Sequence, residues 1–304
     1  MLITSSDNQK YKYISKLRVK KFRDKENSFI IESKKLVEEA ISSADVDFIF
    51  LSEENKDYQS DLEKIVLSKE LFSKITGMVT SDGFAAVVKK PKEKEISSKR
   101  VLLLDKINDP GNMGTIIRSA EAFGFFDIIL MPKTCDVYNE KTLRASMGSI
   151  FRLNIVKKNL DNVKTLKENY TIVSADMSGY DINEYDVDGN LILAIGNEAN
   201  GLSEKIRLMT DSFIKIPMKG QIESLNAAIA ASIIMNKLSL WVGKSLAILI
   251  QKKREWWEPF KFRLDNSPMK LDMKIDTVKL RYRLYEWILI LKSIKVVPQI
   301  FCPF

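Results

Sequence analysis

The sequence contains no histidine, and this absence excludes several kinds of active site. Ser-His-Asp and Cys-His nucleophilic catalysis both need an imidazole, and histidine is the commonest protein ligand of zinc. Any chemistry must therefore depend on Arg, Lys, Asp, Glu, Asn, Ser or backbone groups. We expect no metal cofactor.

Cysteine is almost as scarce, since only Cys135 and Cys302 occur and they form no Cys-x-x-Cys pair. The sequence therefore supports neither a disulfide framework nor a structural zinc site, and a reducing cytoplasm suits it. The N-terminus lacks the apolar core of a signal peptide. Lys237 and Lys244 interrupt the longest apolar region, residues 225–250, so we expect a soluble protein without a membrane span.

Acidic residues are outnumbered, with 48 Lys and Arg against 40 Asp and Glu and a formal net charge of +8. This balance suits a polyanionic partner but is equally typical of an ordinary basic protein. Between Lys10 and Lys25, eight basic residues accompany one acid, and Tyr11, Tyr13 and Phe22 lie among them. The aromatic residues favour an RNA contact over a merely solvated helix face.

Short apolar runs alternate with amphipathic helical patterns through the first 90 residues, which predicts a small α/β domain. The expected strands cover 29–33, 47–51 and 85–90, and the expected helices cover 34–41 and 67–77. Dense charge and one proline in residues 91–100 are typical of a linker. We therefore assign residues 1–90 to a first domain and 91–100 to the linker.

The second predicted domain, residues 101–240, contains apolar runs of the kind found in parallel strands buried on both faces. These runs are Val101–Asp105, Asp127–Met131, Thr171–Ala175, Leu191–Gly196 and Ser212–Pro217. Helical patterns lie between most of them, so a parallel α/β sheet is the expected architecture. Residues 241–304 hold all four tryptophans and form a tail whose role the sequence does not give.

The first motif, Asn108–Gly124, lies between a predicted strand and a predicted helix. Glycines there let the backbone approach a ligand, and free N–H groups favour an anion. The motif is neither the G-x-G-x-x-G fingerprint nor a Walker A loop. The alternative is an ordinary turn, with Asp109 capping the helix and Arg118 on a solvated face.

The second motif, Gly196–Ser203, directly follows a buried strand, where open α/β sheets bind their ligands. Alternatively, Asn197 and Asn200 are turn residues and Ser203 caps the next helix.

The third motif, Ile216–Ser232, is a glycine-containing loop followed by a helix that we expect to begin near Ser224. Close helix packing explains its alanines but leaves the polar cluster Glu223, Ser224 and Asn226 unexplained.

In this order, the three motifs resemble those of the SpoU (TrmH-type) family of RNA 2′-O-ribose methyltransferases. Residues 144–152 are similar to the family's segment between its first two motifs, and residues 16–40 are similar to its ribosomal-protein-like substrate-binding domain. The family usually has Glu-Gly where this chain has Glu32-Ser33. The resemblance covers residues 10–240.

The resemblance implies a trefoil-knotted α/β methyltransferase domain that binds S-adenosylmethionine, bent, mainly through backbone groups of the second and third motifs. It also implies a homodimer with the site near the interface. Carried over by position, the cofactor-binding residues are Ile195, Gly196, Asn197, Gly201, Ile216, Met218, Ser224 and Leu225.

By the same resemblance, the catalytic residues are Arg118, Asn112, Glu198, Ser224 and Asn226. Arg118 would act on the ribose hydroxyl. A guanidinium with a pKa above about 12 is a poor general base, so we expect it to orient the RNA and to stabilise developing alkoxide charge.

The expected function is therefore methylation of a ribose 2′-hydroxyl in structured RNA, with ribosomal RNA the favoured substrate. Two alternatives stay open: a non-catalytic RNA-binding or ribosome-assembly protein, and a transfer-RNA ribose methyltransferase. A Rossmann-type nucleotide enzyme is disfavoured because its fingerprint is missing.

Overall fold

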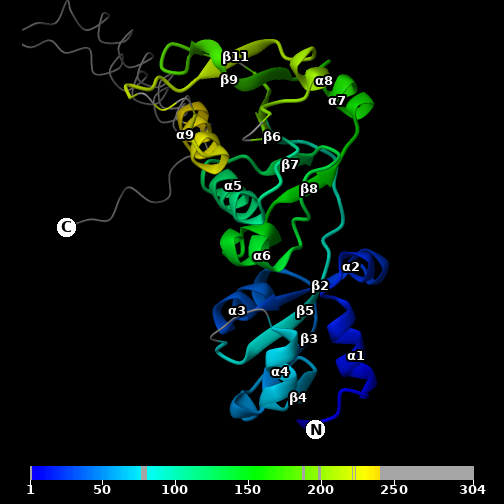
Figure 1. Ribbon diagram of the computed structural model, residues 1–304. Coiled ribbons are helices and arrows are strands. Elements are labelled where there is room, and N and C mark those ends of the chain that lie inside the picture. Colours follow the sequence, from blue (N-terminus) through cyan, green and yellow to red (C-terminus); the bar gives the residue numbers. More distant parts are fainter. Residues whose placement is uncertain are drawn as a thin grey trace, which may run out of the picture. The chain divides into compact units, whose positions relative to one another are not determined.

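The computed structural model describes residues 2–76, 81–186, 189–197, 200–220, 222 and 224–239. Within these residues the strands form two separate sheets (Figure 1). The first has five strands in the order β1-β4-β3-β5-β2, and the second has six in the order β11-β9-β10-β6-β7-β8. Among the helices of these described residues, none has the length and the apolar character that a membrane span requires.

The first sheet is mixed, because β5 runs antiparallel to β2 and β3 while β4 runs parallel to β1 and β3. Its strands are β1 (Leu2–Ile3), β2 (Ser28–Glu32), β3 (Val46–Ser52), β4 (Lys64–Leu67) and β5 (Phe84–Lys89). The helices are α1 (Gln9–Lys16), α2 (Lys20–Glu26), α3 (Lys34–Ser43) and α4 (Lys69–Ile75), with a 3-10 turn η1 (Glu53–Asn55).

Alternation along β3 explains how helices cover both faces of this sheet. Phe48 and Phe50 join the apolar cluster that includes α1 and α4, whereas Ile49 and Leu51 join the cluster that includes α3. Successive side chains of a strand point to opposite faces, so one strand supplies both cores.

The basic segment, residues 10–25, forms two helices, α1 and α2, whose bounds the sequence did not predict. Asn8 caps α1, since its side-chain oxygen accepts the N–H of Lys10 at 2.9 Å. Helix α2 ends at Asn27, whose left-handed backbone (φ 49°) closes the helix. Strands β1 and β4 were not predicted either, because they have only two and four residues.

The second sheet is parallel throughout, which confirms the predicted architecture. Its strands are β6 (Arg100–Asp105), β7 (Asp127–Leu130), β8 (Asn154–Lys157), β9 (Thr171–Asp181), β10 (Leu191–Gly196) and β11 (Ser212–Lys215). Its helices are α5 (Pro110–Ala122), α6 (Glu140–Ser146), α7 (Leu160–Leu166), α8 (Glu204–Arg207) and α9 (Ala227–Ser239), with a 3-10 turn η2 (Ser149–Phe151). Strand β8 was not predicted, because it is short and has a single buried residue.

Helix α5 contains most of the first motif and packs tightly on α6. A Cβ atom at Gly114 would lie 2.5 Å from the Cβ of Ala145 and 2.6 Å from the carbonyl oxygen of Thr142, so the two helices meet at a point where only glycine fits. The hydroxyl of Thr142 also donates to the carbonyl of Pro110 at 3.0 Å. Asp109 caps α5 by accepting the N–H of Asn112 at 2.8 Å, as the sequence suggested.

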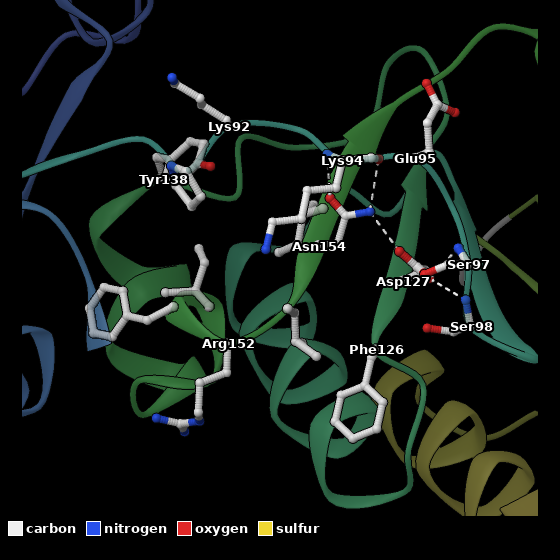
Figure 2. A pocket seen from close by; sticks show the side chains of 15 residues that line it. Lys92, Lys94, Glu95, Ser97, Ser98, Phe126, Asp127, Tyr138, Arg152 and Asn154 are labelled. Atoms are coloured by element: carbon white, nitrogen blue, oxygen red, sulfur yellow. Dashed lines mark hydrogen bonds between the residues drawn. The ribbon is translucent and has the colours of Figure 1, made fainter. Parts of the chain in front are cut away.

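The parallel direction of the strands gives the sheet two chemically different edges. The first motif follows β6, the second follows β10 and the third follows β11, so all three loops leave from the carboxyl edge. The linker instead lies at the amino edge, where Asp127 accepts the N–H groups of Ser97 and Ser98 (Figure 2). The fold therefore separates the linker from the three motifs.

Candidate active site

The first and third motifs meet in a hydrogen bond between two asparagine side chains. Asn226 donates from Nδ2 to Oδ1 of Asn112 at 3.0 Å, although the two residues are 114 positions apart. Asn112 lies in the first turn of α5, and Asn226 directly precedes α9. Two of the predicted catalytic residues are thus in direct contact.

Asn226 also begins its own helix. Its Oδ1 accepts the backbone N–H of Ala228 at 2.9 Å and that of Ile229 at 3.3 Å, which is the geometry of an N-cap. Because backbone N–H groups can only donate, these bonds fix which amide atom is the oxygen and leave Nδ2 for Asn112. Helix α9 accordingly begins at Ala227, three residues after the start expected near Ser224.

A second contact holds α5 against α9 next to Arg118. The hydroxyls of Ser119 and Ser232 lie 2.7 Å apart, and Ser232 donates to the carbonyl of Ala228 at 2.7 Å. Ser119 is therefore the donor in the bond between the two hydroxyls. Arg118 is exposed and makes no hydrogen bond or ion pair with the residues that the structure describes, so its guanidinium is accessible to an external ligand.

The second motif forms a closed loop over the carboxyl edge. Asn197 and Gly201 exchange two backbone hydrogen bonds of 3.0 and 2.9 Å, and Gly201 adopts a positive φ of 62°. A Cβ at Gly196 would lie 2.4 Å from the carbonyl carbon of Gly201, so the loop returns directly over the end of β10. Asn200 donates its N–H to the Asn197 side chain at 3.2 Å, which makes both asparagines turn residues.

The predicted cofactor residues lie at the end of β10 and in the loops of the second and third motifs, and most of them share no hydrogen bond with one another within the described residues. Ile195 is buried at the end of β10, whereas Ile216, Met218 and Leu225 are half-buried. Ser224 is exposed and makes no hydrogen bond within the described part of the chain. Glu198, a predicted catalytic residue, and Glu223 lie outside the described residues.

The chemistry of this set fits an adenosyl ligand. Half-buried apolar side chains lie beside loop backbone groups, and an aromatic base with polar edges needs both kinds of neighbour. Within the residues that the structure describes, no group of three or more Cys, Asp or Glu side chains could hold a metal ion.

The electrostatics of the first motif favour a rigid helix start. A hydrogen bond from the backbone N–H of Asn112, and then one from Lys141, hold the pKa of Asp109 below its usual value. The carboxylate therefore stays ionised at neutral pH at the N-terminus of α5, where the helix dipole stabilises negative charge.

A hollow at the opposite edge of the sheet is unrelated to these loops (Figure 2). Lys92 and Lys94 of the linker line it together with Phe126 and Tyr138. Burial would raise the pKa of Asp127 beside it, but hydrogen bonds from Ser98, Asn154 and Ser97 outweigh that effect and hold the pKa below its usual value. These contacts fasten the linker to the sheet.

Three residues that shape the site were not predicted from the sequence. Nothing in the sequence marked Ser119 and Ser232 as site residues, because serine is common on helices of every kind. Asp105 had a weak one, since it is a single charged residue that ends a run of four apolar residues. Its buried carboxylate accepts the N–H of Ser203 at 2.7 Å.

Comparisons with known proteins agree with this geometry. The sequence model of the SpoU rRNA Methylase family matches residues 99–236, and that of the MRM3-like substrate binding domain matches residues 8–86. The chain is 39% identical over 243 residues to the 23S rRNA (guanosine(2553)-2′-O)-methyltransferase RlmP of Bacillus subtilis, covering 78% of this chain and 98% of the relative. The chain belongs to the SpoU rRNA methylase family.

Solved structures of a SpoU methyltransferase and of an rRNA methyltransferase share the fold. AviRb from Streptomyces viridochromogenes, in complex with the cofactor AdoMet, has a TM-score of 0.70 at 26% identity and covers 76% of this chain and 97% of its own. The AdoMet-bound rRNA methyltransferase from Sinorhizobium meliloti has a TM-score of 0.68 at 27% identity, with coverages of 79% and 97%.

The two functions of Asn226 can be separated by mutation. Asn226→Asp keeps the oxygen that caps α9 but loses the donor to Asn112, so we expect stability near that of the parent and a methylation rate at least ~10-fold lower. Asn226→Ala loses both bonds, and we expect it to cost a further ~1 kcal/mol of stability, which is typical for a lost N-cap. Urea unfolding and initial rates measure the two effects. An aspartate variant with the full rate would contradict a role for the Asn112 contact.

Proposed function

We propose that this SpoU enzyme transfers a methyl group from S-adenosylmethionine to a ribose 2′-hydroxyl of 23S ribosomal RNA. The observation that carries the proposal is the Asn226–Asn112 bond, which joins the first and third motifs at the carboxyl edge of the sheet. The similarity to RlmP extends over 98% of that protein and supports the same class of substrate, with the equivalent guanosine as the first candidate. Ribosomal RNA as substrate implies a cytoplasmic enzyme.

The loops of the second and third motifs, at the carboxyl edge of the sheet, are the proposed cofactor site. Ile195, Ile216 and Leu225 would contact the adenosyl group, while backbone groups of Gly196, Asn197, Gly201 and Met218, and the hydroxyl of Ser224, would bind its polar atoms. S-adenosylmethionine supplies an activated methyl group on a sulfonium, so the protein has to bind, orient and exclude water. The polar residues Asn112, Ser224, Asn226 and Glu198 are proposed to position the reacting ribose.

Arg118 is the proposed catalytic group. Its exposed guanidinium, on a helix fixed at both Asn112 and Ser119, is accessible to RNA. A planar cation with several donors can hold a phosphate and the reacting hydroxyl together and can stabilise the alkoxide charge that develops there. No metal ion is needed for this chemistry.

We infer that the enzyme acts as a homodimer through α9. Ile229 and Ile233 lie one turn apart on this helix with exposed fractions of 53% and 37%, and Ile222 before it is 69% exposed. An apolar stripe on a helix beside the active site is suited to a second copy of the chain. Strand β10 follows β9 in the chain but lies between β9 and β6 in the sheet, and this order supports the trefoil knot that the family resemblance implies.

The N-terminal domain, residues 1–90, is proposed to bind RNA, with residues 91–100 as linker and 101–240 as catalytic domain. The structure divides the basic segment into two groups. Lys10 and Lys12 form ion pairs with Glu63 and Asp7, whereas Lys20, Lys21 and Lys25 are exposed and have no ion pair within the described residues. The second group is available for phosphates.

The predicted tail, residues 241–304, lies outside the described residues.

The proposed substrate can be tested with RNA from a Bacillus subtilis strain that lacks RlmP. We expect the purified protein to transfer tritium from labelled S-adenosylmethionine to the 23S rRNA of this strain but not to its 16S rRNA or transfer RNA. Alkaline hydrolysis should leave the labelled linkage intact, because a 2′-O-methyl group blocks cleavage. The rate should not change when a chelator is added. Label confined to transfer RNA, or recovered on a base, would refute the proposal.

The matched control is 23S rRNA from the parent strain, in which RlmP is active. If the target is the equivalent guanosine, this RNA should accept little label. Equal labelling of both RNAs would show that the enzyme methylates a different nucleotide and would contradict the equivalent guanosine as its target.

Arg118→Ala should leave folding and cofactor affinity near normal and lower the methylation rate by at least ~10²-fold, the scale of losing one positioned transition-state donor. Arg118→Lys should restore little, because an ammonium cannot reproduce the planar fork of the guanidinium. Single-turnover rates with saturating RNA measure both. A fully active alanine variant would contradict the catalytic role.

Replacing Lys20, Lys21 and Lys25 together with glutamine should weaken RNA binding and flatten its salt dependence. Each phosphate that the protein no longer neutralises removes about 0.7–0.9 from the slope of log K against log salt, so we expect the loss of three lysines to change the slope by about 2.1–2.7. The control replaces Lys10, Lys12 and Lys69, which removes equal charge from residues that are already paired with acids. Filter binding across a salt series should separate the two triple variants, and equal losses of affinity would argue against α2 as the RNA-binding element.

A further inference from the structure

Asp105 is a buried carboxylate at the edge of the sheet where the three motifs meet. It is the last residue of β6, its exposed fraction is 2%, and four buried residues, Val101–Leu104, precede it. Taking a carboxylate out of water is costly unless hydrogen bonds compensate for the lost hydration. A charge placed here needs a partner at this edge.

The partner belongs to the second motif. Oδ2 of Asp105 accepts the backbone N–H of Ser203 at 2.7 Å, the short distance expected for a charge-assisted bond. Ser203 is the N-cap residue of α8 but makes no capping bond with its own side chain. Asp105, at the end of β6, therefore places a negative charge at the N-terminus of α8, where the helix dipole stabilises it.

A second bond fastens the other end of the same loop. Asn197 donates from Nδ2 to the carbonyl of Lys106 at 3.1 Å, and the strand register places Gly196 directly opposite Asp105. The second-motif loop is thus tied at both of its ends to two consecutive residues, Asp105 and Lys106. Between the ties, Gly201 adopts a positive φ of 62°, which glycine accommodates without strain.

We propose that Asp105 is a positioning residue that presets the second-motif loop for S-adenosylmethionine. A cofactor held by loop backbone groups binds well only if those groups already point at it, because ordering the loop on binding would consume part of the binding free energy. Asp105 lowers that cost because it fixes one end of the loop before the cofactor binds. The inference rests on the proposed cofactor site, and Asp105 does not contact the reacting atoms.

The chain contains a matched control at the other edge of the same sheet. Asp127, the first residue of β7, is 3% exposed and also accepts backbone N–H groups, from Ser97 at 3.1 Å and from Ser98 at 2.8 Å (Figure 2). Its bonds fasten the linker rather than a motif loop. Loss of either carboxylate leaves buried donors unpaired and should lower stability to a similar extent.

The test compares cofactor affinity by calorimetry in the full-length protein. Asp105→Ala and Asp105→Val should each raise the Kd for S-adenosylmethionine at least ~10-fold. Valine fills the space of the carboxylate, so the valine variant can be measured even if the alanine variant does not fold. Asp105→Asn should restore most of the affinity, because its amide oxygen can still accept the Ser203 N–H. Asp127→Ala should lower the melting temperature and leave the Kd unchanged.

Steady-state rates add a readout that a general loss of stability would not give. The KM for cofactor should rise in Asp105→Val, while kcat at saturating cofactor stays within ~3-fold of the parent. If the parent protein itself does not bind S-adenosylmethionine, the proposed function fails. If the parent binds and Asp105→Val binds equally well, or if Asp127→Ala loses affinity to the same extent, only the role of Asp105 is overturned.

Discussion

The parallel alignment of β6, β10, β9 and β11 is the constraint on which the candidate site depends. Parallel strands put all their carboxyl ends at one edge, so three loops that are far apart in the sequence leave the sheet side by side. Short polar contacts then fix the loops and helices to one another: Asn226 to Asn112, Ser119 to Ser232, and Asp105 to Ser203. Each contact joins segments that are distant in the sequence, so the site exists only in the folded chain.

Much of the architecture could be predicted from the sequence because burial leaves a clear pattern. The runs at Val101–Asp105 and Leu191–Gly196 are buried along almost their whole length, and uninterrupted apolar runs of this kind indicate central parallel strands. Asp109 as the cap of the following helix, which the alternative interpretation of the first motif proposed, is present at the start of α5. The elements that escaped prediction, β1, β4 and β8, have only two to four residues, too few for an apolar pattern to stand out from the surrounding sequence.

The site was harder to predict for a physical reason. The motif residues could be named by resemblance, but their partners depend on tertiary contacts over separations of 98 to 114 residues. Nothing local marks Ser232 as the acceptor of Ser119. Nothing local distinguishes Lys10, which pairs with Glu63, from Lys20, which has no ion pair within the described residues. The composition likewise gives a net charge of +8, but it does not show which basic residues form ion pairs within the protein.

The close packing of α5 on α6 also limits how this sequence can change over evolutionary time. At Gly114 the backbone of one helix lies against Ala145 and the carbonyl of Thr142 on the other. A methyl group gained at position 114 would meet the backbone of α6 as well as Ala145, so no change at position 145 alone could make room for it. Position 114 should therefore stay glycine in any descendant that keeps this packing of α5 on α6.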